Sequence, residues 1–365
     1  MFDFPARRQR LLRLVYEKKA AAILVTDEVN VRYFSGFSGD SSYLLLTDDR
    51  QMIISDSRYN TQIAAECPDL ELVTRTAAQE MKTLVGETLR QLGRNPVAIE
   101  SDAITKSAFD AIAAEVPGVS FVDTVGLGLS LRAVKDATEI EIIRGSIRIA
   151  EMAFRQLCTE LQPEWTEVQA AFRLEEIIRS LGGQGRAFET IVAGDQRAAL
   201  PHAGATKHLL GSAKSVLFDW GAKSQNYCSD LTRVVVTGRP SPTLEKIHRV
   251  ALEAQQKAIL AIRPGASLKE VDAIARDHIA ASGFGAYFGH GLGHGFGLQI
   301  HESPRLSPLA KDNFEVGMVV TVEPGIYLPN DCGVRIEDDV LVTDEGCEVL
   351  SCLPRSLQDN PIDFG

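Results

Sequence analysis

Four acidic residues lie within segments that are otherwise strongly apolar. The segments are Val216–Trp220, Tyr227–Val236, Val319–Pro324 and Gly333–Glu337. The first two flank a short polar connection and predict a hairpin with Asp219 and Asp230 in its arms, and the last two place Glu323 and Glu337 in the same way. A buried carboxylate is costly unless it pairs or binds a cation, and four cannot converge without compensating charge. The pattern therefore predicts a cation site, and two divalent ions would balance the four negative charges.

The competing interpretation is that each acid pairs with a basic neighbour, for example Asp230 with Arg233 or Glu337 with Arg335. A single pair of this kind is common in proteins, whereas four acids in two matching halves favour a shared metal site. Ligation mainly by oxygen, with one imidazole, suits manganese, cobalt or zinc better than copper. Manganese is the ion that we expect on this ground.

The candidate imidazoles cluster in a glycine-rich stretch. Three of the seven histidines, His290, His294 and His301, lie within twelve residues. Glycines beside the first two allow close backbone approach, and imidazole can bind a metal or transfer a proton. The glycine spacing does not follow G-x-G-x-x-G, so a phosphate-binding loop is not expected. The sequence also lacks H-E-x-x-H and a supporting G-x-S-x-G elbow, which argues against a zincin and a serine hydrolase.

The elements that must position these residues form two parts. At 365 residues the chain is long enough for two hydrophobic cores. Strand-like runs at 21–26, 43–47 and 52–55 alternate with helix-like segments such as 77–92, which predicts a mixed α/β domain over residues 1–130. From Thr138 the pattern changes to a long amphipathic helix, so a second domain is expected over residues 131–365.

The second part contains an internal repeat. A capping-box helix opens at Thr166 and ends at Gly182, and another opens at Ser267 and ends at Gly283, sixteen positions later in each case. Each of these helices follows a longer helix and precedes strand-rich sequence. This order predicts an α+β fold whose second domain is pseudo-two-fold, with helices packed on one face of a largely antiparallel sheet.

Composition restricts the partners and the compartment that we expect. The formal net charge of −11, from 38 basic and 49 acidic residues, disfavours binding to nucleic acid or to anionic lipid. No run approaches the length of a membrane helix, and the N-terminus lacks the apolar core of a signal peptide. The six cysteines are scattered without a C-x-x-C pair, as is usual for reduced thiols, so a cytoplasmic protein is expected.

Several motifs together resemble the pita-bread metallopeptidases, in particular the Xaa-Pro branch that contains prolidase and aminopeptidase P. The segments that carry this resemblance are Phe218–Ala222, Tyr227–Arg233, His290–Glu302, Thr321–Tyr327 and Gly333–Asp339. Asn30–Phe37 and Asp56–Tyr59 resemble the creatinase-like N-terminal domain of the same family, so the likeness covers most of the chain. It implies a creatinase-like N-terminal domain followed by a pita-bread catalytic domain.

The resemblance also implies a site for two metal ions. Position by position, Asp219 would bind one ion, His294 and Glu323 the other, and Asp230 and Glu337 would bridge both. Every one of these positions holds a residue that can ligate a metal. Creatinase-type relatives, which cleave C–N bonds without a metal, lack the full set.

Further residues take implied roles in catalysis. Glu323 corresponds to the proton acceptor. His301, and His202 in the loop Leu200–Gly204, correspond to residues that stabilise the tetrahedral intermediate or pass a proton to the leaving proline nitrogen.

The implied substrate contacts involve three residues. His290 would help to form a pocket for the proline ring. Arg305 would hold the free carboxylate of a dipeptide, since a guanidinium matches a carboxylate with two hydrogen bonds. Arg335 is a second candidate for that carboxylate, although it also lies where it could pair with a ligand acid.

The activity implied by the resemblance is hydrolysis of the bond between an N-terminal residue and a following proline. Arg305 favours a dipeptidase, that is, a prolidase. Aminopeptidase P, which acts on longer peptides, is the alternative within the enzymes, and a catalytically silent binding module on the same scaffold is the alternative outside them. Family members commonly form homodimers, so a homodimer is implied here too.

Overall fold

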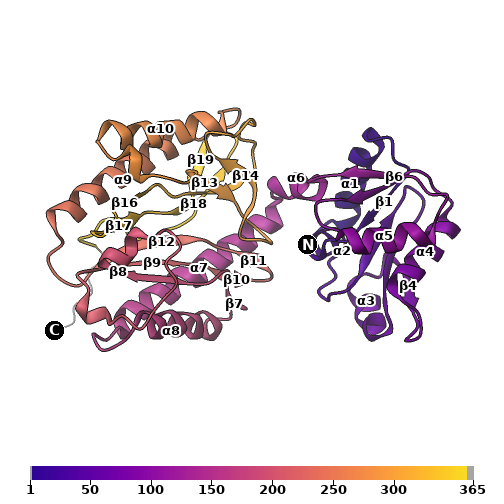
Figure 1. Ribbon diagram of the computed structural model, residues 1–365, viewed down its shortest axis with the longest axis horizontal. Helices are drawn as coiled ribbons and strands as arrows, with labels where there is room; N and C mark the ends of the chain where they lie inside the picture. Colours follow the sequence, from indigo (N-terminus) through magenta and orange to yellow (C-terminus); the bar gives the residue numbers. More distant parts are fainter. Residues whose placement is uncertain (1, 360–365) are drawn as a thin grey trace. The chain divides into compact units, whose positions relative to one another are not determined.

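The computed structural model describes residues 2–359 of the chain, which divides into two compact units, Met1–Arg132 and Ala133–Gly365 (Figure 1). Each unit has its own sheets and its own helices. Among the helices between residues 2 and 359, no apolar stretch reaches the length needed to span a lipid bilayer.

The first unit is built on a six-stranded sheet with the strand order β4-β3-β2-β1-β5-β6. Its strands are β1 (Ala22–Val25), β2 (Tyr43–Leu46), β3 (Gln51–Asp56), β4 (Glu71–Arg75), β5 (Val97–Glu100) and β6 (Phe121–Thr124). The pairs β1–β2 and β2–β3 are antiparallel, whereas β1–β5, β3–β4 and β5–β6 are parallel. The hairpin expected between 43–47 and 52–55 is therefore confirmed, as is the mixed character of this unit.

Six helices accompany this sheet. They are α1 (Phe4–Glu17), α2 (Glu28–Ser35), α3 (Asn60–Glu66), α4 (Met81–Leu92), α5 (Lys106–Glu115) and α6 (Leu127–Ala133). The helix predicted at 77–92 begins four residues later, because Gln79 N donates to Thr76 O and closes a turn just before it. Leu84 and Val85 of α4 are buried in one core with strand residues such as Leu24 and Ile54.

The second unit contains four long helices. They are α7 (Ala137–Glu160), α8 (Glu167–Ser180), α9 (Pro242–Ala261) and α10 (Leu268–Ala281). The capping box predicted at Thr166 is present, with Gln169 as its reciprocal partner. Ser267 caps α10 by accepting a hydrogen bond from the backbone of Glu270, but the reciprocal half of the capping box predicted there is not found among the described residues. The helix boundaries of the predicted repeat are thus confirmed.

The strands of the second unit follow each helix pair. They are β7 (Gly185–Arg186), β8 (Ile191–Gly194), β9 (Ser215–Trp220), β10 (Ala222–Ser224), β11 (Tyr227–Cys228) and β12 (Leu231–Val236) in the first half, then β13 (Gly293–Gly295), β14 (Glu302–Leu306), β15 (Val319–Val322), β16 (Gly325–Tyr327), β17 (Gly333–Arg335), β18 (Asp338–Val342) and β19 (Cys347–Val349) in the second. The named strands of this unit pair antiparallel. The order of two helices followed by strands occurs twice, as predicted.

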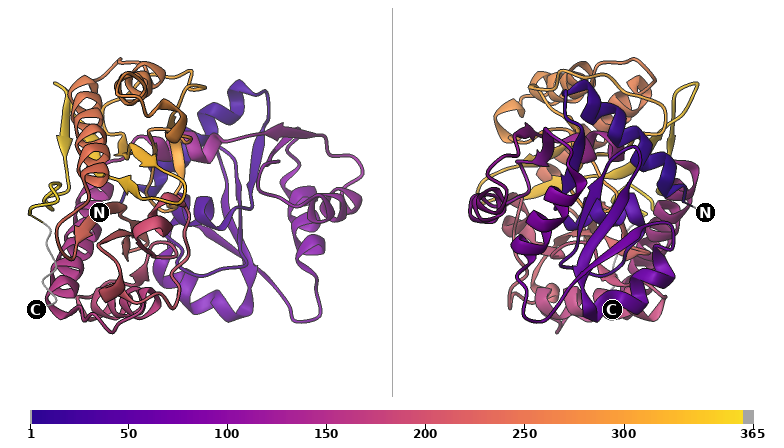
Figure 2. Two further views of the ribbon diagram at one scale, coloured as in Figure 1. Left: turned by 60° about the vertical axis from the view of Figure 1, so that its left-hand side comes forward. Right: turned by 90° about the vertical axis from the view of Figure 1, so that its right-hand side faces the viewer.

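The helices of each half pack against the strands of the same half. Figure 1 shows α8 below β8, β9 and β12, α7 running diagonally beside them, and α9 and α10 above β16 and β17. Phe154 of α7 stacks on Trp220 of β9, with ring centroids 4.2 Å apart. In the second half, Ile247 and Ala251 of α9 share a core with Val334. The left view of Figure 2 shows the orange helix α9 along its length at the edge of this unit.

Candidate active site

The four acidic residues lie at places where strands begin or end. Asp219 is within β9, whereas Asp230 directly precedes β12, Glu323 directly follows β15 and Glu337 directly precedes β18. The β15–β18 pairing ends at the pair Val322–Asp338, so the two glutamates leave the ladder at the same place. Between them the chain makes the hairpin β16–β17. Asp230 and Glu323 therefore stand one residue outside the strands in which the sequence placed them, and Glu337 stands two residues beyond β17.

These segments bring a compact group of ligand atoms together. One ligand atom each from Asp230, His294 and Glu337 lie within 4.8 Å of one another. His294 Nε2 is 3.4 Å from a carboxylate oxygen of Glu323 and 3.6 Å from one of Asp230. One cluster thus contains Asp230, Glu323, Glu337 and His294, and Asp219 lines the same cavity.

Glycines on both sides of His294 make this approach possible. A Cβ on Gly293 would lie 2.0 Å from Thr321 O, and one on Gly295 would lie 2.1 Å from Ser303 O. Both distances are far below van der Waals contact, so only glycine lets β13 pass this close to its neighbours. The close backbone approach predicted around His294 is confirmed.

Burial strongly disfavours negative charge in the cluster. Burial, followed by repulsion from neighbouring acids, raises the pKa of Asp230 and Glu337 well above the usual range. Burial, aided by Asp219, raises the pKa of Glu323 to about 8. Burial also lowers the pKa of His294 to about 3, so this imidazole is neutral. Positive charge at the centre of the cluster would stabilise the ionised carboxylates.

The donor atoms fit a divalent cation. His294 Nδ1 donates to Gly295 O at 3.1 Å, which leaves the lone pair of Nε2 facing the carboxylates. Asp219 Oδ1 is buried and has no hydrogen-bond partner within residues 2–359. Carboxylate oxygens with one neutral imidazole are the donor set that manganese, cobalt and zinc accept. Asp219, Asp230, His294, Glu323 and Glu337 could therefore hold metal.

Arg335 lies beside this cluster and contacts one of its acids. Its Nη2 donates to Asp219 Oδ2 in a short hydrogen bond, and its Nε donates to Thr232 Oγ1 at 3.1 Å. A third contact runs from Nη1 to the hydroxyl of Tyr327, 2.9 Å away. The arginine that the sequence offered for substrate binding therefore pairs with Asp219.

His290 is connected to the same arginine. Its Nδ1 donates to Gly291 O at 2.8 Å, and burial lowers its pKa to about 4. Its unprotonated Nε2 therefore accepts from the hydroxyl of Tyr327, 2.9 Å away. Tyr327 thereby links His290 to Arg335 and fixes the orientation of the imidazole.

All predicted site residues line one cavity of about 830 Å³. The cavity contains the acidic cluster, His290 and Arg335, together with His202, His301 and Arg305, which are exposed to it. Its volume is typical of a pocket for a small ligand. His202 is about 90 residues from His290 in the sequence, and the fold alone brings the two into one cavity.

Sequence reasoning assigned no role to two threonines beside the ligands. Thr232 Oγ1 donates to Glu337 Oε2 at 2.6 Å, and Thr321 Oγ1 donates to Glu323 Oε1 at 3.2 Å. Each threonine lies two positions from an acid of the cluster, Asp230 or Glu323. The spacing of Thr321 and Glu323 was a usable signal, because side chains two apart in an extended segment share a face. The contact of Thr232 with Glu337, 105 residues away, left no such local signal.

A buried carboxylate outside the cavity holds the loop of His202. Glu167, the first residue of α8, accepts from Gly194 N at 2.9 Å, from Arg197 Nε at 3.0 Å, and from the amide and hydroxyl of Thr206. Arg197 in turn donates to Gly204 O. Both ends of the loop are therefore fixed to one helix N-terminus.

Glu167→Gln should lower the free energy of unfolding by about 2 kcal/mol, because an amide group would face donors that a carboxylate now satisfies. Urea unfolding followed by circular dichroism measures this change. Glu164→Gln, at an exposed position just before the same helix, should change stability by less than about 0.5 kcal/mol. Equal stability of the two variants would contradict a structural role for Glu167.

Comparison with known proteins supports these observations. Residues 141–344 match the model of metallopeptidase family M24, and residues 7–134 match the creatinase/prolidase N-terminal domain. The chain is 37% identical over 349 residues to a Bacillus subtilis (strain 168) protein described as an uncharacterized peptidase, covering 96% of this chain and 98% of that protein.

Two solved structures are similar over nearly their full length. A Bacillus anthracis protein described as an Xaa-Pro dipeptidase has a TM-score of 0.94 and 36% identity, covering 97% of this chain and 99% of its own. An X-Pro aminopeptidase from Thermotoga maritima MSB8 has a TM-score of 0.88 and 36% identity, covering 96% and 99%. The α+β fold and the resemblance to the Xaa-Pro branch are both confirmed. The chain is therefore a metallo-exopeptidase that belongs to metallopeptidase family M24 and carries the creatinase/prolidase N-terminal domain.

Proposed function

We propose that the chain is a dinuclear-metal peptidase that hydrolyses the bond between an N-terminal residue and a following proline, with residues 131–365 as its catalytic domain. The buried cluster of Asp230, His294 and Glu337, whose ligand atoms lie within 4.8 Å of one another, carries this proposal. The names of the Bacillus anthracis and Thermotoga maritima relatives support it.

The proposed ligands divide between two ions. Asp219 would hold one ion, His294 and Glu323 would hold the other, and Asp230 and Glu337 would be shared between them. Divalent ions bound there supply positive charge that polarises a carbonyl and lowers the pKa of water. The chain contributes the geometry, because Thr232 and Thr321 each donate a hydrogen bond that fixes a glutamate carboxylate.

Three residues take the proton-transfer and charge-stabilising roles. Glu323, at the edge of the cluster, accepts a proton from the attacking water. His301 packs edge-on against His294, with ring centroids 4.5 Å apart, and is exposed to the cavity. His301 and His202 donate hydrogen bonds to the carbonyl oxygen as it gains charge, or pass a proton to the leaving nitrogen.

Substrate specificity depends on two sides of the cavity. His290, held by Tyr327 and packed edge-on against Phe288 with ring centroids 5.0 Å apart, forms part of an apolar surface for the proline ring. Arg305 is exposed to the cavity and binds the carboxylate of a dipeptide. Arg335 contacts substrate at the cavity wall while it pairs with Asp219.

A dipeptidase is the finer proposal, and aminopeptidase P is the second candidate. The name of the Bacillus anthracis relative favours the first, and that of the Thermotoga maritima relative favours the second. A silent binding module would have no need for a complete ligand set, which makes it the weakest of the three.

The test is hydrolysis of Ala-Pro, Ala-Pro-Ala and Ala-Ala by chelator-treated protein resupplied with manganese, cobalt or zinc. Metal-dependent cleavage of Ala-Pro alone supports a dipeptidase. Cleavage that extends to Ala-Pro-Ala supports an aminopeptidase P. If no peptide is cleaved with any metal, the peptidase proposal is wrong and the binding module replaces it.

Arg305→Ala should raise the KM for Ala-Pro by roughly 30-fold, because a charge-assisted hydrogen bond is worth about 2 kcal/mol. The KM for Ala-Pro-Ala should change much less, since its carboxylate lies one residue further from the scissile bond. Steady-state kinetics on both peptides measures this difference. An equal effect on the two substrates would remove the reason to prefer a dipeptidase.

The remaining proposals concern the metal, the assembly and the compartment. The oxygen-rich ligand set favours Mn²⁺, with Co²⁺ or Zn²⁺ as alternatives. Family likeness supports a homodimer, and all six cysteines are free, as expected in the cytoplasm. The acidic surface disfavours nucleic acid and membrane partners. Metal analysis of protein purified without added metal, and light scattering, test the metal and the dimer.

A further inference from the structure

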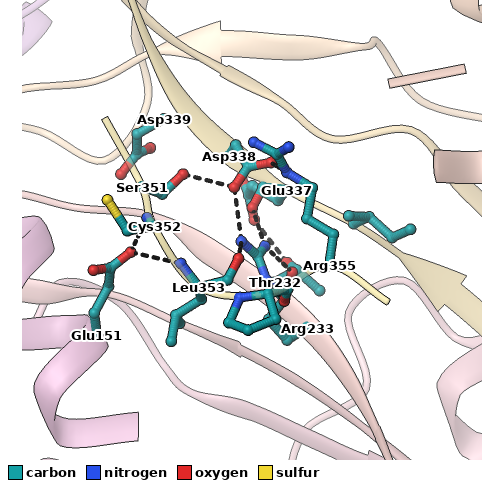
Figure 3. Close-up of polar contacts among 12 residues, drawn as sticks. Glu151, Thr232, Arg233, Glu337, Asp338, Asp339, Ser351, Cys352, Leu353 and Arg355 are labelled. Atoms are coloured by element: carbon teal, nitrogen blue, oxygen red, sulfur yellow. Dashed lines mark hydrogen bonds and ion pairs between the residues drawn. The ribbon is translucent and has the colours of Figure 1, made fainter. Parts of the chain in front are cut away.

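Asp338 directly follows the proposed bridging ligand Glu337 and is fully buried. Its Oδ1 accepts from Arg233 Nη2 at 2.7 Å and from Ser351 Oγ at 2.6 Å, and its Oδ2 accepts from Arg355 Nε (Figure 3). Two guanidinium groups therefore balance one buried carboxylate. The side chain of Asp338 takes no place in the cluster of ligand atoms.

A glutamine from α9 completes the set of donors to Asp338. Gln255 Nε2 donates to Asp338 Oδ2 at 2.9 Å, to Val322 O at 3.0 Å and to Ile336 O at 3.1 Å. These two carbonyls belong to the residues directly before Glu323 and Glu337. The pairing of β15 with β18 ends at this point, so Gln255 connects the two backbone segments where the strand ladder stops.

Arg233 makes the corresponding contacts on the other side of Asp338. Its Nη1 donates to Glu337 O at 2.6 Å and to Thr232 O at 2.9 Å. Its other nitrogens donate to Leu353 O and Pro354 O, at 2.9 and 2.8 Å. Figure 3 shows how this one guanidinium joins the segment that contains Glu337 to the segment that follows β19. The backbone of Glu337 is thereby tied to the C-terminal segment.

We propose that Asp338 is a positioning residue for the metal centre, and that Gln255, Arg233 and Arg355 act through it. The carboxylate of Asp338 orients the amide of Gln255 and the neighbouring guanidinium groups. These donors hold the backbone from which Glu323 and Glu337 extend. This inference rests on the proposed function, because it takes both glutamates as metal ligands. It adds residues from α9 and the C-terminal segment to the machinery of the site.

A merely structural role would not require this arrangement. Buried ion pairs can often be replaced by packed apolar side chains without loss of stability, so stability alone does not account for one acid with two arginines. Three of the donations end on the carbonyls of Val322, Ile336 and Glu337, at or next to the ligands, where small displacements would spoil ligation. Groups that orient metal ligands typically contribute a factor of about 10 to 100 in metal affinity.

The main test is Gln255→Met in the full-length protein, which keeps the side-chain volume and removes all three donations. Calorimetric titration of Mn²⁺ into chelator-treated protein should show a Kd about 10 to 100 times weaker than in the wild type. With Mn²⁺ at saturation, kcat for Ala-Pro should fall while KM stays near the wild-type value, because no residue of the cavity wall has changed. Thermal unfolding of the metal-free protein shows separately whether the variant is folded.

A second variant covers the case in which Gln255→Met does not fold. Arg355 is about one-third exposed, with a side-chain exposure of 31%, so Arg355→Met should fold, and it removes one donor to Asp338. We expect its Mn²⁺ affinity to fall by about tenfold. Arg144→Met is the matched control, since Arg144 is similarly exposed and pairs with Glu348 on β19 without contact to Asp338. Its Mn²⁺ affinity should equal that of the wild type.

The outcomes separate this inference from the proposed function. Wild-type protein that binds no Mn²⁺ would overturn the ligand set itself. Wild-type binding together with unchanged affinity in folded Arg355→Met and Gln255→Met would overturn the positioning role alone. Weaker affinity in Arg144→Met as well would also overturn it, because the effect would then come from any loosening of the C-terminal segment.

Discussion

Asp230→Asn is expected to abolish hydrolysis of Ala-Pro, with kcat/KM at least 10³-fold below the wild-type value. Asp230 is proposed to bridge both ions, so the asparagine amide that replaces its carboxylate would weaken the binding of both ions at once. Loss of the charge stabilisation supplied by a metal amounts to several kcal/mol, and about 4 kcal/mol corresponds to 10³-fold in rate. Steady-state kinetics at saturating Mn²⁺ measures this loss. Glu337→Gln should behave in the same way.

The fold should survive this substitution. Asp230 is buried beside Glu337, Asp219 and Glu323, whose repulsion disfavours its charge. Removal of that charge should leave the metal-free protein at least as stable as the wild type, whereas added Mn²⁺ should no longer raise its melting temperature. Asp344→Asn, in an exposed turn, is the control and should keep both activity and metal stabilisation. Wild-type activity in Asp230→Asn would contradict the dinuclear site.

Removal of metal from the wild-type protein should have the second-largest effect. Each ion at 100 times its Kd stabilises the folded state by about 2.7 kcal/mol, so two ions contribute about 5 kcal/mol. For a unit of this size, 1 kcal/mol shifts the melting temperature by about 2 to 4 °C. Chelation should therefore lower the melting temperature of the catalytic unit by roughly 10 to 20 °C and remove activity. Both should return when Mn²⁺ is restored.

The number of ions distinguishes this prediction from a single-metal site. Calorimetric titration should give two Mn²⁺ per chain in the wild type. A stoichiometry of one Mn²⁺ per chain, with half the expected shift in melting temperature, would show that Asp219 and the proposed bridging acids do not hold a second ion. A melting temperature unaffected by chelation would contradict metal binding at the cluster as a whole.

The sequence by itself singled out the four acids and a group of three histidines as candidates for the site. A carboxylate within an apolar strand-like run is unusual, because burial of its charge is costly, and it can be recognised from the neighbouring residues alone. Asp219, Asp230, Glu323 and Glu337 stand out for this reason. Glycines flank both His290 and His294, so the choice of His294 as the ligand came from the resemblance to the pita-bread metallopeptidases. The repeat of two helices and strands was equally visible, since helix caps and hydrophobic periodicity are local signals. These features were enough for the α+β fold, and the motifs around the acids and histidines carried the resemblance to the family.

Tertiary structure alone decided how the cluster is supported. Gln255 contacts carbonyls 67 and 81 residues away, and Arg233 contacts carbonyls up to 121 residues away. Glu167 holds Thr206 across 39 residues. Each of these contacts joins a side chain to the backbone or polar groups of a distant segment. A backbone carbonyl can accept a hydrogen bond whatever the type of its own residue. No pattern in the chain records such a pairing, because the geometry exists only when the strands and helices have packed.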